Sequence, residues 1–122
     1  MTNDSANVEA TIARYFRGMK EGDVALLKSS FHDQAGFFGP FGSDLIAAPI
    51  GHLYAWAEEN LPLENGGGDD HRIEIDEVDI RGPIALVKCR ELGFMGHDFA
   101  EYFTLLKTES GWKITNKSYS AM

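Results

Sequence analysis

Hydrophobic residues near the start of the chain recur with a helical period. The stripe consists of Val8, Ile12, Tyr15, Phe16 and Met19. Apolar residues three and four apart share one face of a helix, so this spacing predicts an amphipathic helix. Asp4 or Ser5 can cap its start, and Gly22 can end it in a left-handed turn. Asp23 can then cap a short second helix over residues 24–30.

The middle of the chain mixes helix-breaking and helical patterns. Three glycines and Pro40 within residues 36–42 exclude a helix and predict a short irregular strand or loop. Pro49 suits the first turn of a third helix, which ends near residues 60–62. The inward positions of that helix are Ile50, Leu53, Trp56 and Ala57. The run Asn-Gly-Gly-Gly-Asp at residues 65–69 predicts a flexible connection.

After the glycine run the hydrophobic period changes from helical to two, which indicates β-strands. Ile73 and Ile75 lie on one face, whereas Val78 and Ile80 have the opposite phase. A β-bulge at residues 76–77 would restore a single apolar face. Further strands are expected over residues 84–92, 97–108 and 112–120, with turns at 81–83, 93–96 and 109–111.

These elements predict a single α+β domain over residues 1–122. Three N-terminal helices are expected to pack on one face of a curved antiparallel sheet of about four to five strands. Short helices do not fill the whole concave face of such a sheet, so a pocket between helices and sheet is expected.

Charge argues against a nucleic-acid partner. The chain carries a formal net charge of −8, which repels phosphate backbones. The nearest basic group, Lys107, Lys113 and Lys117, is three charges scattered over a hairpin. Seven of the nineteen acidic side chains lie between residues 64 and 79, in a pattern typical of the solvated side of a strand.

Cysteine content and the N-terminus bear on location. Cys89 is the only cysteine, so an intramolecular disulfide and a Cys-rich metal site are excluded. Its place in mid-strand favours a small core residue over a nucleophile. Residues 1–5 have neither the basic nor the apolar run of a signal peptide, and no stretch approaches the ~20 apolar residues of a membrane span. We therefore expect a cytoplasmic protein without membrane contact.

Two parts of the sequence resemble a known family. Residues 13–23, Ala-Arg-Tyr-Phe-Arg-Gly-Met-Lys-Glu-Gly-Asp, with Phe-His-Asp-Gln-Ala at 31–35, resemble the opening of the NTF2-like superfamily. Tyr-Phe-Thr-Leu-Leu-Lys at 102–107 and Gly-Trp-Lys-Ile-Thr-Asn-Lys at 111–117 resemble the ending of its lumazine-binding branch. The resemblance implies a cone-shaped, cystatin-like fold with an interior cavity, commonly a homodimer through the outer face of the sheet. SnoaL-like proteins, polyketide cyclases, dehydratases and ketosteroid isomerases share the fold, so the fold alone does not give the function.

The resemblance to ketosteroid isomerases fills two of three catalytic positions. Tyr15 falls where a helix tyrosine holds the oxyanion, and Glu101 falls near the protonated carboxyl group that assists it. The position of the proton-shuttling aspartate is Gly39. Without a base there is no route for proton abstraction, so steroid isomerisation is not expected.

His32 is the best acid/base candidate in the chain. It lies at the end of the predicted second helix, near the expected cavity, and an imidazole titrates in the useful range. The competing interpretation is an exposed histidine favoured by the helix dipole. Tyr15 also has two interpretations, because it either lines the pocket or belongs to the apolar stripe with its hydroxyl bonded to the backbone.

The role of Glu101 depends on strand register. It shares a face with Phe99, Phe103 and Leu105, where burial would raise the pKa of its carboxyl group and make it an acid. One register of the preceding hairpin places Lys88 opposite Glu101 and forms a plain ion pair. A shift by one residue places Cys89 there instead.

The other candidates suggest an apolar pocket without a metal or cofactor. Phe38 and Trp56 supply aromatic walls, and Asn116 could orient a ligand carbonyl or ring nitrogen. His97 and Glu101 are four residues apart on a strand, roughly 13 Å, too far to share one ion easily. His52 and His71 have no ligand at useful spacing, and neither a calcium loop nor a phosphate loop is present.

Three functions are consistent with these patterns. The first is binding of a small, mostly apolar or aromatic ligand at Tyr15, His32, Phe38, Trp56, Glu101 and Asn116. The second is acid/base catalysis on a carbonyl compound, with His32 as base and Tyr15 and Glu101 as oxyanion donors. The third is a non-catalytic dimerisation or scaffold module whose concavity is filled by its own side chains.

Overall fold

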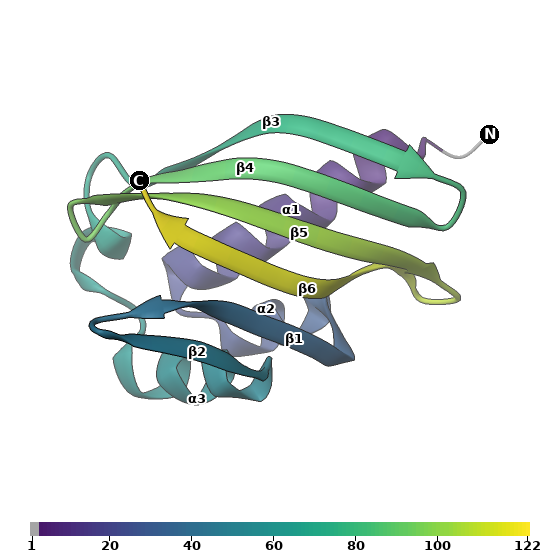
Figure 1. Ribbon diagram of the computed structural model, residues 1–122. Helices are drawn as coiled ribbons and strands as arrows, with labels where there is room; N and C mark the ends of the chain where they lie inside the picture. Colours follow the sequence, from purple (N-terminus) through teal and green to yellow (C-terminus); the bar gives the residue numbers. More distant parts are fainter. Residues whose placement is uncertain (1–2) are drawn as a thin grey trace.

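The computed structural model describes residues 3–122 as three helices on one face of a six-stranded sheet (Figure 1). The helices are α1 (Asp4–Glu21), α2 (Val24–Ser30) and α3 (Gly51–Asn60), with a 3-10 helix η1 at Glu64–Gly67. The strands are β1 (Phe31–Phe41), β2 (Asp44–Pro49), β3 (Arg72–Arg81), β4 (Ile84–Phe94), β5 (His97–Thr108) and β6 (Gly111–Ala121). The predicted α+β fold is confirmed, with six strands rather than four to five.

The strands lie in the order β2-β1-β6-β5-β4-β3. Neighbouring strands are antiparallel except β1 and β6, which are parallel. The β1–β2 hairpin thereby extends a meander formed by the last four strands. The predicted bulge in β3 is present, because the register with β4 shifts between Ile75 and Glu77.

Local signals in the sequence fix the ends of the first two helices. Gly22 ends α1 with a φ of 72°, in the left-handed region that glycine adopts without strain. The Asp23 side chain accepts a hydrogen bond from the amide of Leu26 and so caps α2. The cap of α1 is Asn3 rather than Asp4 or Ser5, because the Asn3 side chain accepts from the amide of Ala6.

The sequence predicted either a short irregular strand or a loop for residues 36–42, and the strand is confirmed for residues 36–41. Residues 36–41 are the second half of β1, which pairs with β2 on one side and β6 on the other. Their burial alternates, with Phe37 and Gly39 inward and Phe38 outward, as a pleated strand requires. Gly39 and Pro40 lie beyond Phe38, the last residue of β1 that pairs with β6, so the amide hydrogen that Pro40 lacks is not needed for that pairing.

The core lies between α1 and the inner face of the sheet. Its largest fully buried apolar side chains are Tyr15, Phe103, Ile12, Leu27, Leu105 and Ile114. The opposite, outer face is open to solvent and carries large apolar side chains. Phe38 is 43% exposed, Tyr102 53% and Leu45 80%.

Candidate functional site: a polar cluster inside the core

Five polar side chains meet between α1 and the inner face of the sheet. Tyr15 comes from α1, Glu91 from β4, Glu101 from β5 and Lys117 from β6, while His71 immediately precedes β3. Each of the five is at most 4% exposed. We call this group the polar cluster. Buried charges are costly unless they are paired, so such a group in a small core calls for an explanation.

Lys117 occupies the centre of the polar cluster. Its Nζ lies 3.6 Å from Glu101 Oε2. The same ammonium lies 5.1 Å from the ring centroid of Tyr15, 5.4 Å from that of Phe37 and 5.1 Å from that of Tyr119. One carboxyl group and three aromatic rings therefore replace the water that the ammonium loses on burial.

Glu101 has a strongly raised pKa, of about 8. Burial is the largest cause, because it disfavours the charged carboxylate. Lys117 acts in the opposite direction, and the neighbouring Glu91 raises the pKa further. The register that produces this environment places Cys89, not Lys88, opposite Glu101. Glu101 can therefore donate a proton at neutral pH, unlike an ordinary glutamate.

His71 and Glu91 form the second half of the polar cluster. His71 Nε2 lies 3.3 Å from Glu91 Oε1, and both side chains are almost completely buried. The other ring nitrogen, Nδ1, lies 2.6 Å from the carbonyl oxygen of Gly66. A carbonyl only accepts hydrogen bonds, so Nδ1 carries a proton and Nε2 is the nitrogen that faces the carboxyl group.

Tyr15 completes the polar cluster from the helix side. Its ring packs against Phe31 and Phe103, with centroids 5.8 Å and 5.3 Å away. Burial, together with the charges of Glu101 and Glu91, raises the pKa of its hydroxyl well above the usual value. The hydroxyl therefore remains a neutral group that can donate a hydrogen bond.

Four buried polar atoms of the cluster have no hydrogen-bond partner among the residues that the structure describes. They are Tyr15 Oη, His71 Nε2, Glu91 Oε1 and Glu101 Oε1. An unpaired buried polar atom costs roughly 1–3 kcal/mol, so four in one place are an unusual concentration. Among residues 3–122, no three His, Cys, Asp or Glu side chains are arranged to hold a metal ion. The donors and acceptors here suit an organic molecule or water.

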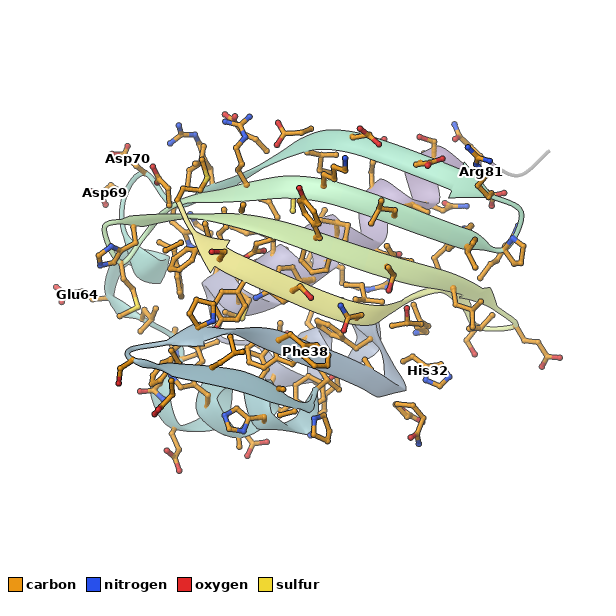
Figure 2. All side chains as sticks on the ribbon, in the orientation of Figure 1. His32, Phe38, Glu64, Asp69, Asp70 and Arg81 are labelled. Atoms are coloured by element: carbon orange, nitrogen blue, oxygen red, sulfur yellow. The ribbon has the colours of Figure 1, made fainter. Side chains whose placement is uncertain are left out.

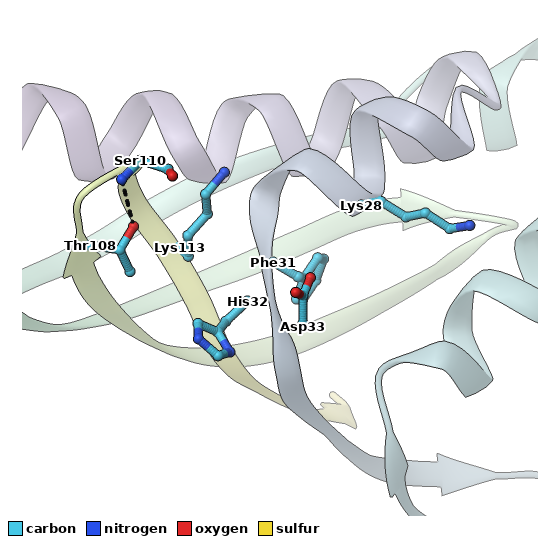
Figure 3. A pocket seen from close by; sticks show the side chains of 7 residues that line it. All are labelled: Lys28, Phe31, His32, Asp33, Thr108, Ser110 and Lys113. Atoms are coloured by element: carbon cyan, nitrogen blue, oxygen red, sulfur yellow. Dashed lines mark hydrogen bonds between the residues drawn. The ribbon is translucent and has the colours of Figure 1, made fainter.

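His32 lies apart from the polar cluster. It is the second residue of β1 rather than the end of α2, and its Nδ1 accepts a hydrogen bond from the amide of Gln34. Because strand residues alternate, His32 points away from the core that buries Phe31 (Figure 2). It lines an open cleft of about 390 Å³ beside Lys28, Asp33 and Lys113 (Figure 3).

The remaining predicted pocket residues are also dispersed. Phe38 lies on the outer face of the sheet (Figure 2), and so does Asn116, which pairs with Gly36 of β1 and Thr104 of β5. The Asn116 amide donates to the hydroxyl of Ser118. Trp56 is half-buried on α3 and packs against the edge of the core.

The aromatic ring of Tyr119 occupies the space beside Gly39. A Cβ atom added at Gly39 would lie 2.3 Å from Cε1 of that ring. The Tyr119 hydroxyl donates a 2.7 Å hydrogen bond to the carbonyl of Pro40 and fixes the ring in place. The position that resembles the isomerase base therefore has neither a carboxylate nor room for one.

Sequence reasoning missed Lys117 because of a bulge in β6. Thr104 pairs with Asn116 and Leu105 with Ile114, so Thr115 is an extra residue on β6. Without it, alternation from Trp112 would place Asn116 inward and Lys117 outward. His71 and Glu91 were missed as well, although Glu91 alternates in phase with the buried Val87 and Cys89 and could have been found from that pattern.

Among residues 3–122, no helix combines the length and apolar character needed to span a membrane. This holds for α1, an 18-residue helix that carries charged side chains along its length.

Several solved structures have the same fold. An NTF2-like protein of unknown function from Methylobacillus flagellatus KT is 25% identical, with 100% of this chain and 94% of that one covered and a TM-score of 0.84. A ketosteroid isomerase-like protein from Erwinia carotovora atroseptica is 19% identical, with 100% and 98% covered and a TM-score of 0.75. The CaMKII hub of S. rosetta is 13% identical, with 100% and 99% covered and a TM-score of 0.76.

No curated protein matches the chain. One family model does, over residues 3–120, and its description is "Putative lumazine-binding". The matched range contains every helix and nearly all of every strand. The chain therefore belongs to the family that carries this description, and its fold is NTF2-like.

Proposed function

We propose that the protein binds a small, planar, mostly aromatic molecule at the polar cluster, between α1 and the sheet. The observation that carries the proposal is the set of four buried polar atoms without partners, contributed by Tyr15, His71, Glu91 and Glu101. A ligand that paired with them would recover the free energy that their burial costs. Ligand sites of this kind are mostly apolar, with a few converging polar groups.

The chemistry of these atoms indicates which edge of the ligand they would contact. A Glu91 oxygen can accept a hydrogen bond from an N–H group, whereas the Tyr15 hydroxyl and the protonated Glu101 carboxyl group can donate to carbonyl groups. Phe37 and Tyr119, whose rings stack on each other with centroids 5.5 Å apart, would form an aromatic wall beside a flat molecule. Lumazine, a bicyclic ring with N–H and carbonyl groups side by side, has these properties and agrees with the description of the family.

The direct test is a titration of the purified protein with lumazine, followed by the change in lumazine fluorescence. We expect saturable binding that weakens at least about tenfold in Glu101→Gln, which replaces the carboxyl contact with an amide, and in Tyr15→Phe, which removes the hydroxyl contact. Asn116→Ala is the matched control, because Asn116 is polar but lies on the outer face. Equal affinity in all three variants would contradict a site at the polar cluster.

Acid/base catalysis on a carbonyl compound is the second candidate function. The pKa of about 8 at Glu101 favours it, because a carboxyl group that keeps its proton at neutral pH can stabilise a developing oxyanion beside Tyr15. His32 lies too far from this pair in the fold to be its base, so His71 takes that role in the candidate mechanism. Turnover that survived both Tyr15→Phe and Glu101→Gln would remove these donors from the mechanism.

A homodimer formed through the outer face of the sheet is the proposed assembly. A row of paired residues crosses this face, namely Ala47, Phe38, Ser118, Tyr102 and Lys88. Phe38 and Tyr102 are about half exposed in the single chain, and burying them would remove apolar surface from water. Native mass spectrometry of a Phe38→Ser/Tyr102→Ser double variant tests this proposal, with a monomer as the expected result and an intact dimer against it.

A cytoplasmic location is proposed on the basis of Cys89. It is a free, buried thiol in a chain that has no second cysteine to pair with. Such a chain gains nothing from an oxidising compartment. Fractionation of cells that express a tagged chain tests the location, and recovery outside the cytoplasm would contradict it.

A further inference from the structure

An open cleft lies between η1 and the β4–β5 hairpin, at the opposite end of the molecule from His32 (Figure 2). Its volume is about 410 Å³. It is lined by Leu63, Glu64, Gly67, Gly68, Met95 and Gly96. The acidic side chains of Glu64, Asp69 and Asp70 project into solvent around this end (Figure 2), so the cleft itself is bounded largely by backbone.

The floor of this cleft is one residue thick. Gly67 is buried, and a Cβ atom added to it would lie 3.0 Å from His71 Nδ1 and 3.0 Å from Phe94 Cδ1. His71 is thus in contact with the inner side of Gly67. On the far side of the imidazole, Nε2 faces Glu91 at 3.3 Å, and Glu91 in turn adjoins Glu101. A single glycine and one imidazole therefore separate the cleft from the polar cluster.

The segment that forms the floor has features of a backbone segment that opens locally. Residues 66–68 are three glycines, all with positive φ, of 62°, 98° and 133°. They have no side chains to anchor them in the core. The segment is held by hydrogen bonds rather than by apolar contacts: the Gly66 amide donates to Leu63 O at 3.0 Å, the Met95 amide to Gly67 O at 2.7 Å, the His71 amide to Gly68 O at 3.2 Å, and His71 Nδ1 to Gly66 O at 2.6 Å. Segments with few apolar contacts are those that open locally without global unfolding.

His71 connects this segment to the polar cluster. Its Nδ1 donates to the carbonyl of Gly66, while its Nε2 faces Glu91. The Lys20 ammonium donates to the backbone carbonyl of His71 at 2.8 Å and holds the residue from the side of α1. Rotation of the imidazole would break the contact with the glycine segment and the contact with Glu91 together.

We infer that this cleft is the mouth of the interior site, that residues 66–68 are its lid, and that His71 latches the lid to the polar cluster. The identity of the mouth as a ligand entrance rests on the proposed binding function. The lid motion itself rests only on the geometry of the glycine segment and His71.

The cleft beside His32 is a less suitable entrance. Its inner wall is Phe31, whose side chain is almost completely buried and packs edge-on against Tyr15. Opening that route requires a whole aromatic side chain to leave the core. Opening the glycine lid displaces backbone and one imidazole, whose aromatic neighbours Phe16 and Phe94 are only partly buried.

Cys89 is a natural reporter of access to the interior. Its thiol is 2% exposed, and the residue pairs with Glu101 on the inner face of the sheet. The experiment follows methylthiolation of the purified protein by methyl methanethiosulfonate, using intact mass, at a fixed pH and in 0–2 M urea. Local opening gives a labelling rate that does not change with urea, whereas global unfolding gives a rate that rises steeply.

Two variants distinguish the routes. His71→Gln removes the imidazole latch, and we expect it to label Cys89 at least about tenfold faster, with the rate still independent of urea. Lys113→Ala, in the wall of the His32 cleft, is the control and should label at the wild-type rate. An unchanged rate in His71→Gln, or labelling of the wild type only through the urea-dependent path, would overturn the lid.

Hydrogen exchange distinguishes local opening of the lid in His71→Gln from a general loss of stability. In wild-type protein, amides of residues 66–71 should exchange at least about tenfold faster than those of α1, and His71→Gln should increase exchange at the lid alone. Equal acceleration in α1 would count against a local lid. If the labelling and exchange results are as expected but the protein does not bind lumazine, the proposed ligand is refuted and the lid is not.

Discussion

Lys117 and Glu101 are almost completely buried, and their charged atoms lie 3.6 Å apart inside the core. Desolvation nevertheless outweighs this attraction, since the carboxyl group has a pKa of about 8. A proton thus competes with the ammonium for the same carboxylate around neutral pH. This competition makes the stability of the protein depend on pH in a way that specific variants can isolate.

Glu101 should make the protein less stable as the pH rises from about 4.5 to about 8. In that range the unfolded chain has released the Glu101 proton and the folded chain retains it, so each rise in pH favours unfolding by up to about 1.4 kcal/mol per unit. Urea unfolding at several pH values measures the slope. Glu101→Gln should flatten it, whereas Glu77→Gln, on the outer face, should not. A slope unchanged by Glu101→Gln would contradict the assignment.

Lys117→Met should be more damaging at high pH than at low pH. At pH 6 the carboxyl group of Glu101 is protonated, so loss of the ammonium leaves no unpaired carboxylate in the core. At pH 9 the wild type pairs carboxylate with ammonium, and the variant must keep the proton on Glu101 or bury an unpaired charge. We expect the loss in unfolding free energy to be at least about 1 kcal/mol larger at pH 9. Lys88→Met, which removes an exposed lysine, should show no such difference.

Tyr15→Phe should leave stability almost unchanged. The hydroxyl that it removes is buried and has no hydrogen-bond partner among the described residues. The unfolding free energy should therefore change by less than about 1 kcal/mol in either direction. The ring contacts with Phe31 and Phe103 remain. Thermal and urea unfolding check the prediction. A loss above about 2 kcal/mol would mean that the hydroxyl has a structural partner.

Gly39→Ala should destabilise the protein by about 1–3 kcal/mol, because its Cβ would overlap the ring of Tyr119. Gly51→Ala is the matched control, since a Cβ at that position in α3 meets nothing within 4 Å. The control should be neutral or should stabilise by up to about 1 kcal/mol, because alanine favours helix. Equal effects of the two substitutions would show that Tyr119 does not fill the space.

Most of the fold follows from the hydrophobic periodicity of the sequence and from the residues that end or interrupt its helices and strands. The stripe of α1, the glycine that ends it and the bulge in β3 all have local causes, and each was predicted from residues close together in the chain. For β1 the sequence predicted only a short irregular strand or a loop over residues 36–42, because of its glycines and Pro40, whereas the strand begins at Phe31. Its strand conformation depends on pairing with β6, about 80 residues further along the chain.

The site was harder to predict because small shifts in register decide which side chains meet. The extra residue Thr115 turns Lys117 into the core and Asn116 out of it, and nothing near this position in the sequence announces the bulge. β1 begins at Phe31, earlier in the chain than the sequence suggested, so His32 is a strand residue that points away from the core. Tyr15 and Glu101, which lie on regular parts of α1 and β5, do come together as the sequence suggested.

The most direct test of the account is native mass spectrometry of the protein as purified, compared with the same sample after denaturation. We predict a dimer that carries an additional small mass per chain, lost on denaturation and absent or reduced in Glu101→Gln. A bare protein that also fails to take up lumazine at millimolar concentration would contradict ligand binding at the polar cluster.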